Sequence, residues 1–142
     1  MNRLVQFIRL PARDRLLLIE AVSLLTLASG LIPLLSFQRI VRRLGEHMAD
    51  SPDRQETRAI TEARRIRWAV SAGARHLPWH PVCLPQAVTA KVMLRRRHIP
   101  ATLYLGVDRG SGFDAHAWVR VGRVIVTGAP EHKRFSIVSM FA

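Results

Sequence analysis

The sequence predicts an α+β protein, with helices first and a small antiparallel sheet last. Two patterns predict this class: apolar residues recur at helical spacing over about residues 12–97, and they alternate with polar residues from residue 102 onward. A tight Gly122-Arg123 connection between two alternating segments is typical of an antiparallel hairpin. Helices that precede an antiparallel sheet along the chain are characteristic of the α+β class.

The N-terminal helix is predicted over residues 12–29, and it overlaps a long apolar stretch, Leu16–Phe37. Its charge-free part, residues 21–37, has 17 residues, which is the lower limit for crossing a membrane. Extension toward the N-terminus meets Glu20, and an acidic side chain costs about 3 kcal/mol to insert. We therefore expect a helix that is buried or faces a partner, with membrane contact as the alternative. Asp14 and Glu20 also argue against a cleaved signal peptide.

Three further helices are predicted before the sheet. The second spans about residues 36–48, and the turn-forming, acidic residues 49–53 after it are the best candidate for an internal hinge. The third carries a stripe of small and apolar residues over 59–77, with its arginines largely outside the stripe. The fourth spans residues 84–97, and its last turn holds the basic triplet 95–97, where cations interact favourably with the helix dipole.

The C-terminal part is predicted to form three strands and a short edge strand. Alternation of apolar and polar residues predicts strands over 102–107, 115–121 and 124–127. A turn is expected at Asp108–Gly112, and Phe135–Phe141 is the candidate edge strand.

Length and composition set the limits on organisation and partners. In a chain of 142 residues, we expect residues 1–50 to form a helical extension packed on a core of residues 51–142, together one compact unit. Basic residues number 22, of which 20 are arginine, against 10 acidic residues, a net charge of +12. This charge favours polyanions, an anionic membrane surface or an acidic protein as partner, and composition does not choose among them. The single cysteine, Cys83, excludes a disulfide within the chain and zinc sites with several thiolates.

Cys83 is the candidate nucleophile. It follows a proline-bearing loop and precedes a predicted helix with Pro85 in its first turn, so it is expected at or beside the helix N-terminus. The positive end of the helix dipole and the free backbone N–H groups there stabilise a thiolate. The same N–H groups could hold the oxyanion of a tetrahedral intermediate.

A thiolate nucleophile needs a base, and His116 is the best placed of six histidines. It lies in a predicted strand whose other face is apolar, next to Trp118, on a sheet that could pack over the Cys83 helix. His80 is the competitor, because it is close to Cys83 in sequence.

Four segments together resemble a known family: Cys83–Ala87, Leu94–Pro100, Leu103–Val107 and Ala115–Val119. They are similar to the lasso-peptide leader-processing cysteine proteases, also described as the microcin-processing protein C-terminal-domain family. The resemblance covers about residues 82–126 well and the preceding helices loosely. It implies a transglutaminase-like, papain-related core, with Cys83 as nucleophile and His116 as general base, that removes the leader of a ribosomally made precursor peptide.

The sequence departs from the family pattern at one position. The pattern ends its third strand with an aspartate that orients the histidine, twelve residues after it, and here that position is Gly128. Glycine cannot fix the tautomer of His116 through a carboxylate. The alternatives are Thr127, Glu131, Asp114, a backbone carbonyl or water, or else an impaired enzyme.

The resemblance also implies partners and a location. A separate leader-recognition protein is expected, because nothing at this N-terminus is similar to a fused recognition domain, and a lasso cyclase is the expected downstream partner. The expected location is the cytoplasm. The resemblance implies that maturation can depend on ATP, yet the sequence has no G-x-x-x-x-G-K-[ST] loop, and no cofactor or metal is expected on the chain itself.

Two other functions stay open. One is a thiol-dependent acyltransferase, because transfer to an amine uses the same thioester as hydrolysis. The other is a non-catalytic basic module that binds a membrane or nucleic acid; we expect no nucleic-acid partner, because no nucleic-acid motif is visible and few aromatic residues lie among the arginines.

Overall fold

A computed structural model describes residues 2–108, 110 and 114–142 of the chain. Within these residues the helices are α1 (Arg3–Arg9), α2 (Ala12–Leu31), α3 (Phe37–Leu44), α4 (Thr57–His76), α5 (Cys83–Arg96) and a short 3-10 helix η1 (Glu131–Arg134). The strands are β1 (Thr102–Asp108), β2 (Asp114–Val121), β3 (Val124–Thr127) and β4 (Ser136–Phe141).

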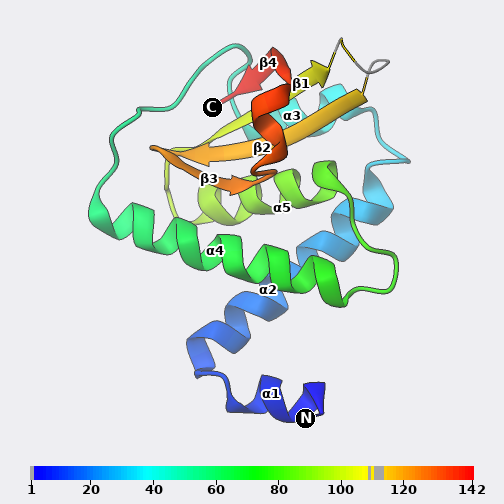
Figure 1. The fold of residues 1–142 in the computed structure, drawn as a ribbon, viewed down its shortest axis with the longest axis vertical. Coiled ribbons are helices and arrows are strands. Elements are labelled where there is room, and N and C mark those ends of the chain that lie inside the picture. The colour runs from blue at the N-terminus through cyan, green and yellow to red at the C-terminus, as the bar shows by residue number, and fades with distance from the viewer. Residues whose placement is uncertain (1, 109, 111–113) are drawn as a thin grey trace.

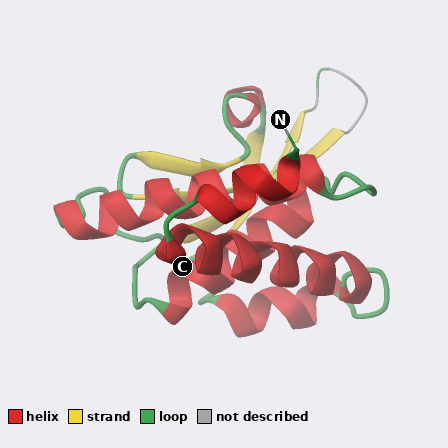
Figure 2. Cartoon of the chain, turned by 90° about the horizontal axis from the view of Figure 1, so that it is seen from below, coloured by secondary structure: helices red, strands yellow, loops and turns green. Residues whose placement is uncertain are grey.

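The strands form one antiparallel sheet with the order β3-β2-β1-β4. Helix α5 is the middle layer: it contacts β2 on one side and α2 and α4 on the other, while α4 also contacts β3 (Figure 1). Seen from below, the helices cover one face of the sheet (Figure 2). The α+β prediction with a small antiparallel sheet is therefore confirmed.

Most predicted elements are present with small changes in their bounds. The third and fourth predicted helices are α4 and α5, and the predicted edge strand is β4, which pairs with β1. Helix α1 was not predicted; it has no buried residue and lies at the far end of the molecule from the sheet (Figure 1). Helix α3 ends at Leu44, four residues earlier than expected. The turn predicted over residues 108–112 lies partly outside the described residues.

Ion pairs fasten α2 to α4 and α5. Glu20 of α2 contacts Arg97 at 2.6 Å and Arg96 at 2.9 Å, and Arg65 of α4 contacts Asp14 at 2.8 Å. Glu20, which interrupts the apolar N-terminal stretch, therefore binds two arginines of the basic triplet at the end of α5. In the described part of the chain, no helix is long and apolar enough to cross a membrane.

The segment predicted as a hinge is bound to the sheet. The Asp50 carboxylate accepts hydrogen bonds from Thr102 (2.9 Å), Tyr104 (2.6 Å) and Arg120 (2.7 Å), and the Ser51 hydroxyl is 2.6 Å from the Thr102 hydroxyl. Burial by itself raises the pKa of Asp50, but hydrogen bonds from Tyr104, Arg120 and Thr102 outweigh it and hold the pKa below its ordinary value. These contacts fix the loop between α3 and α4 against the outer face of the sheet.

Lys91 is a buried cation in α5. Only 4% of its surface is exposed, and its ammonium donates a hydrogen bond to the carbonyl oxygen of Ala101. Burial, with a smaller contribution from the nearby Arg95, lowers the pKa of Lys91 from 10.5 to about 8.

Lys91 is expected to make stability rise with pH. Between about pH 8 and 10.5 the unfolded chain binds a proton at Lys91 that the folded protein has lost, so the free energy of unfolding increases with pH there. Relative to a Lys91→Met variant, the gain should approach about 3 kcal/mol across this window. Urea unfolding of both proteins at pH 7.5, 9 and 10.5 measures it, and parallel pH profiles would contradict the burial of this charge.

Candidate active site

Cys83 is the first residue of α5, as the sequence predicts. The preceding Val82 is extended and contributes no side-chain cap, and the first N–H groups of a helix have no partner within the helix. The loop before the cysteine is held by Gln86, whose side-chain amide donates to the Pro81 carbonyl at 2.8 Å. The half-buried Cys83 thiol is therefore attached at the positive end of the α5 dipole.

His116 lies on a part of β2 that has no strand beside it on the β3 side. Strand β3 ends at Thr127, which pairs with Val119, so β2 continues past the end of β3 toward His116. A pocket of about 320 Å³ lies at this edge, and both Cys83 and His116 line it. The other described lining residues come from α4, α5 and the β3–η1 segment: Arg67, Ser71, Gln86, Ile125, Val126, Thr127, Gly128, Ala129 and Glu131.

The structure thus brings together the two residues that the sequence selects. His80, the competing base, is exposed and is not among the described lining residues of this pocket. From the sequence, Arg67 and Ser71 were not identified as site residues. They lie four residues apart on α4, are exposed, and fall outside its apolar stripe. That spacing is a usable signal, because it places both side chains on one helix face.

A backbone carbonyl holds His116. Its Nε2 is 2.9 Å from the carbonyl oxygen of Gly128, the residue at the position of the expected aspartate. A carbonyl oxygen can only accept, so the shared proton belongs to Nε2. In the neutral ring, Nδ1 then carries no proton and is the nitrogen available as a base.

The side chains that the sequence offered for orienting His116, those of Asp114, Thr127 and Glu131, make no hydrogen bond to it among the described residues. Asp114 is 3.8 Å from Arg134 in an ion pair. The Thr127 hydroxyl is buried and has no hydrogen-bond partner among the described residues, and Glu131 lines the pocket without a hydrogen bond to His116 in that same part of the chain. Of the protein groups considered from the sequence, the backbone carbonyl of Gly128 is the one within hydrogen-bond distance of His116 among the described residues.

Glycine is required at residue 128 for two reasons. Its φ of +85° belongs to the left-handed region that side chains disfavour. A Cβ there would lie 2.6 Å from the Trp118 Cβ and 2.9 Å from the His116 Nε2, both too close. With this backbone, a carboxylate at residue 128 does not fit, and the carbonyl takes the place beside the ring.

Aromatic rings fix the plane of His116. Its ring stacks on Phe135 with centroids 4.9 Å apart and on Trp118 at 5.9 Å. Gly106 pairs with His116 across β1 and β2, and a Cβ on it would lie 2.8 Å from Phe135 and from the Trp118 ring. From the sequence, Phe135 was not connected to the site. The one local signal is Gly106 inside an alternating strand, because a glycine there often marks the close approach of another group.

Among the described residues, no group of three or more His, Cys, Asp or Glu side chains is arranged to hold a metal ion. What the pocket offers chemically is a thiol at a helix N-terminus and an imidazole with a fixed tautomer. Those two groups are the minimum for nucleophilic catalysis by cysteine.

A comparison with protein families gives a match to a model of the transglutaminase-like superfamily over residues 31–140. The match runs from the end of α2 to β4 and includes Cys83, His116 and Gly128. Comparisons with curated proteins and with solved structures give no match.

Substitution of Gly128 is expected to damage the site. Gly128→Ala should lower the free energy of unfolding by about 1–3 kcal/mol, because its Cβ contacts Trp118 and His116 and its backbone is strained. Gly128→Asp should lose as much and should not speed alkylation of Cys83, although it adds the carboxylate of the family pattern. Denaturant unfolding and the rate of iodoacetamide labelling measure the two effects.

Gly30→Ala is the matched control for this prediction. Gly30 lies within α2 with no atom within 4 Å of a Cβ, so alanine there should leave stability unchanged or raise it by up to about 1 kcal/mol. A Gly128→Asp protein that is as stable as the parent and labels faster would show that the carbonyl is not the preferred partner of His116.

Proposed function

This chain belongs to the transglutaminase-like superfamily, which in general contains cysteine peptidases and acyltransferases, and from this premise we propose that it is a cysteine peptidase that works through a Cys83 thioester. The observation that carries the proposal is the shared pocket of Cys83 and His116, with His116 Nε2 bonded to the Gly128 carbonyl. Membership of the family alone does not assign the two roles; the geometry supports them.

In the proposed first step, His116 Nδ1 takes the proton of the Cys83 thiol and the thiolate attacks the scissile carbonyl carbon. The carbonyl oxygen becomes negative, and the free N–H groups at the start of α5 are the donors closest in sequence to the nucleophile. The C–N bond then breaks, and the leaving amine receives the proton from the imidazolium. The product is a thioester between the acyl group and the Cys83 sulfur.

In the second step, water replaces the amine. His116 Nδ1 takes a proton from water, the hydroxide oxygen attacks the thioester carbonyl, and the C–S bond breaks. The acyl group leaves as a carboxylic acid, and the proton returns to the sulfur. An amine in place of water would give acyl transfer from the same thioester.

The Gly128 carbonyl fixes the ring but supplies no negative charge. A hydrogen bond from an imidazolium to a carboxylate is roughly twice as strong as one between neutral groups. The positive ring that forms when Cys83 loses its proton is therefore stabilised less here than it would be by an aspartate. The proposed enzyme accordingly keeps the orientation of His116 and gives up part of the electrostatic support.

The proposed substrate is the leader segment of a lasso-peptide precursor. Support for this finer assignment is the similarity of the four segments around Cys83, the Arg95–Arg97 triplet, β1 and β2 to the leader-processing proteases. The proposal includes a separate leader-recognition protein, a lasso cyclase that uses the released core peptide, and maturation in the cytoplasm.

Leader release from a candidate precursor, in the presence of its recognition protein, tests the function. Cys83→Ala is expected to abolish release, and His116→Ala to slow it on the order of 100-fold or more, because a general base contributes about that much. Mass spectrometry follows the released leader with and without ATP, and with an added amine that would reveal acyl transfer. Amine adducts as the main product would reassign the chain as an acyltransferase.

His80→Ala is the control histidine, and it should release leader at the parent rate because His80 is exposed and outside the described lining of the pocket. The circular dichroism of each variant checks its fold. Undiminished release by Cys83→Ala would overturn the thioester mechanism.

A further inference from the structure

A second groove lies beside the pocket, along α4 and β3. It has a volume of about 450 Å³, and Arg67, Ile125 and Ala129 line both it and the pocket of Cys83 and His116. The rest of its described lining is mostly basic or aliphatic: Arg64, Arg123, Val124, Pro130, His132 and Lys133. We call this the basic groove.

The cations of the basic groove differ from the arginines that form ion pairs within the fold. Arg65, Arg97 and Arg120 each contact a carboxylate at 3.2 Å or less. The exposed cations of the basic groove, by contrast, make no ion pair with the described residues; they are Arg64, Arg67, Arg123 and Lys133.

The surroundings of His132 also indicate a positive local potential. Its Nδ1 is shielded from solvent and has no hydrogen-bond partner among the described residues. Burial lowers the pKa of His132, and the positive charges of Lys133 and His116 lower it further, against the opposing effect of Glu131. Glu131 lies on the side of the active-site pocket, so a negative charge does line that pocket but does not line the basic groove.

We infer that the basic groove binds the carboxylate of an aspartate or glutamate side chain of the peptide substrate, close to the scissile bond. Shared lining places the two cavities side by side, and Arg67 lines both, so a peptide whose carbonyl reaches Cys83 has the basic groove next to it. Arginine side chains match carboxylates in charge and in planar geometry. The aliphatic residues of the groove can receive the methylene groups of the same side chain.

A nucleic acid fits this groove less well than a peptide. Single-stranded nucleic acids are held by aromatic rings on which bases stack, in addition to basic side chains. The residues that the structure describes along the groove include no phenylalanine, tyrosine or tryptophan.

The inference rests on the proposed function for its substrate class, but alkylation of Cys83 tests it without any hydrolysis. The probes are short peptides with an N-terminal bromoacetyl group and either aspartate or asparagine one, two or three positions away. Because the chain has a single cysteine, labelling of Cys83 is read directly by mass. In at least one position, the aspartate probe should label about tenfold faster than its asparagine partner at low salt, and less so at high salt.

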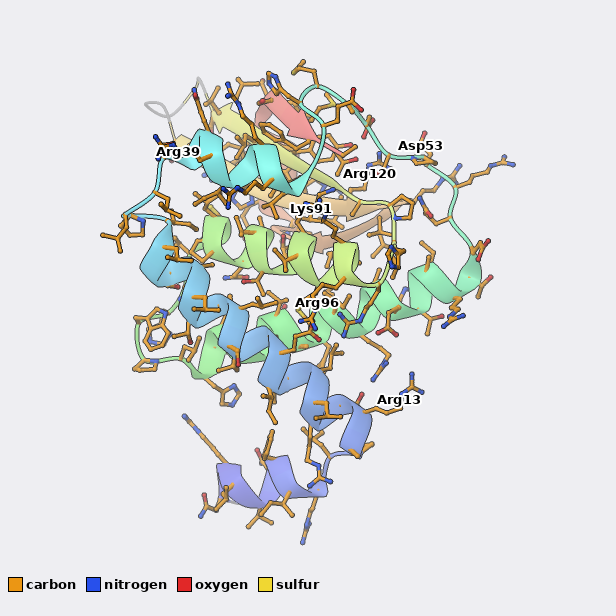
Figure 3. The ribbon with its side chains drawn as sticks, turned by 180° about the vertical axis from the view of Figure 1, so that it is seen from behind. Arg13, Arg39, Asp53, Lys91, Arg96 and Arg120 are labelled. Carbon is orange, nitrogen blue, oxygen red and sulfur yellow. The ribbon has the colours of Figure 1, made fainter. Side chains whose placement is uncertain are left out.

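Two double variants of equal net charge locate the effect. Arg64→Gln with Arg123→Gln should remove most of the aspartate preference, because both residues line the basic groove and neither lines the pocket of Cys83. Arg13→Gln with Arg15→Gln should retain it, since Arg13 lies at the start of α2, away from the sheet (Figure 3).

Each outcome decides the inference. An equal loss of preference in both double variants would show that only the net charge of the chain attracts the probe, and would overturn it. Stronger protection of Cys83 by a short oligonucleotide than by an acidic peptide would overturn the choice of a peptide. If the aspartate probe is preferred but no leader is released, the carboxylate site stands and the proposed peptidase function is overturned. If leader is released but aspartate is not preferred, the peptidase function stands and the carboxylate site is overturned.

Discussion

The hydrogen bond between His116 Nε2 and the Gly128 carbonyl is the contact on which the candidate site depends. It requires a backbone at φ +85° directly after β3, and it requires that no side chain project from that residue. Because β3 ends at Thr127, the chain can turn there toward the exposed part of β2. The tautomer of the imidazole, and hence the identity of the basic nitrogen, follows from this one turn.

The aromatic contacts also orient the His116 ring, through packing rather than through a hydrogen bond. Phe135 and Trp118 limit rotation of the His116 ring by packing, and Gly106 leaves the space that both rings need. A hydrogen bond to a neutral carbonyl is weaker than one to a carboxylate, so packing has a larger share in orienting this histidine. Glycines at residues 106 and 128 therefore leave the space that the rings of His116, Phe135 and Trp118 occupy.

Charge on this molecule has two distinct uses. Two arginines are paired and join three helices: Arg65 and Arg97 bind Asp14, Glu20 and Glu62. Beside the candidate active site, the cations of the basic groove are exposed and make no ion pair in the described part of the chain. A net charge of +12 conceals this division, because composition counts both kinds of arginine alike.

Local pattern was sufficient for much of the fold and for the positions of Cys83 and His116 within it. Helical spacing and prolines predicted that Cys83 lies at or beside the start of α5, and alternation predicted the strand that carries His116, because both depend on residues close together in sequence. The partner of His116, the place of Phe135 and the pairing of Glu20 with Arg97 depend on residues that the fold brings together from 12 to 77 positions apart. Only the tertiary structure decided these, since each follows from backbone direction and from the space left by neighbouring elements, which no local pattern specifies.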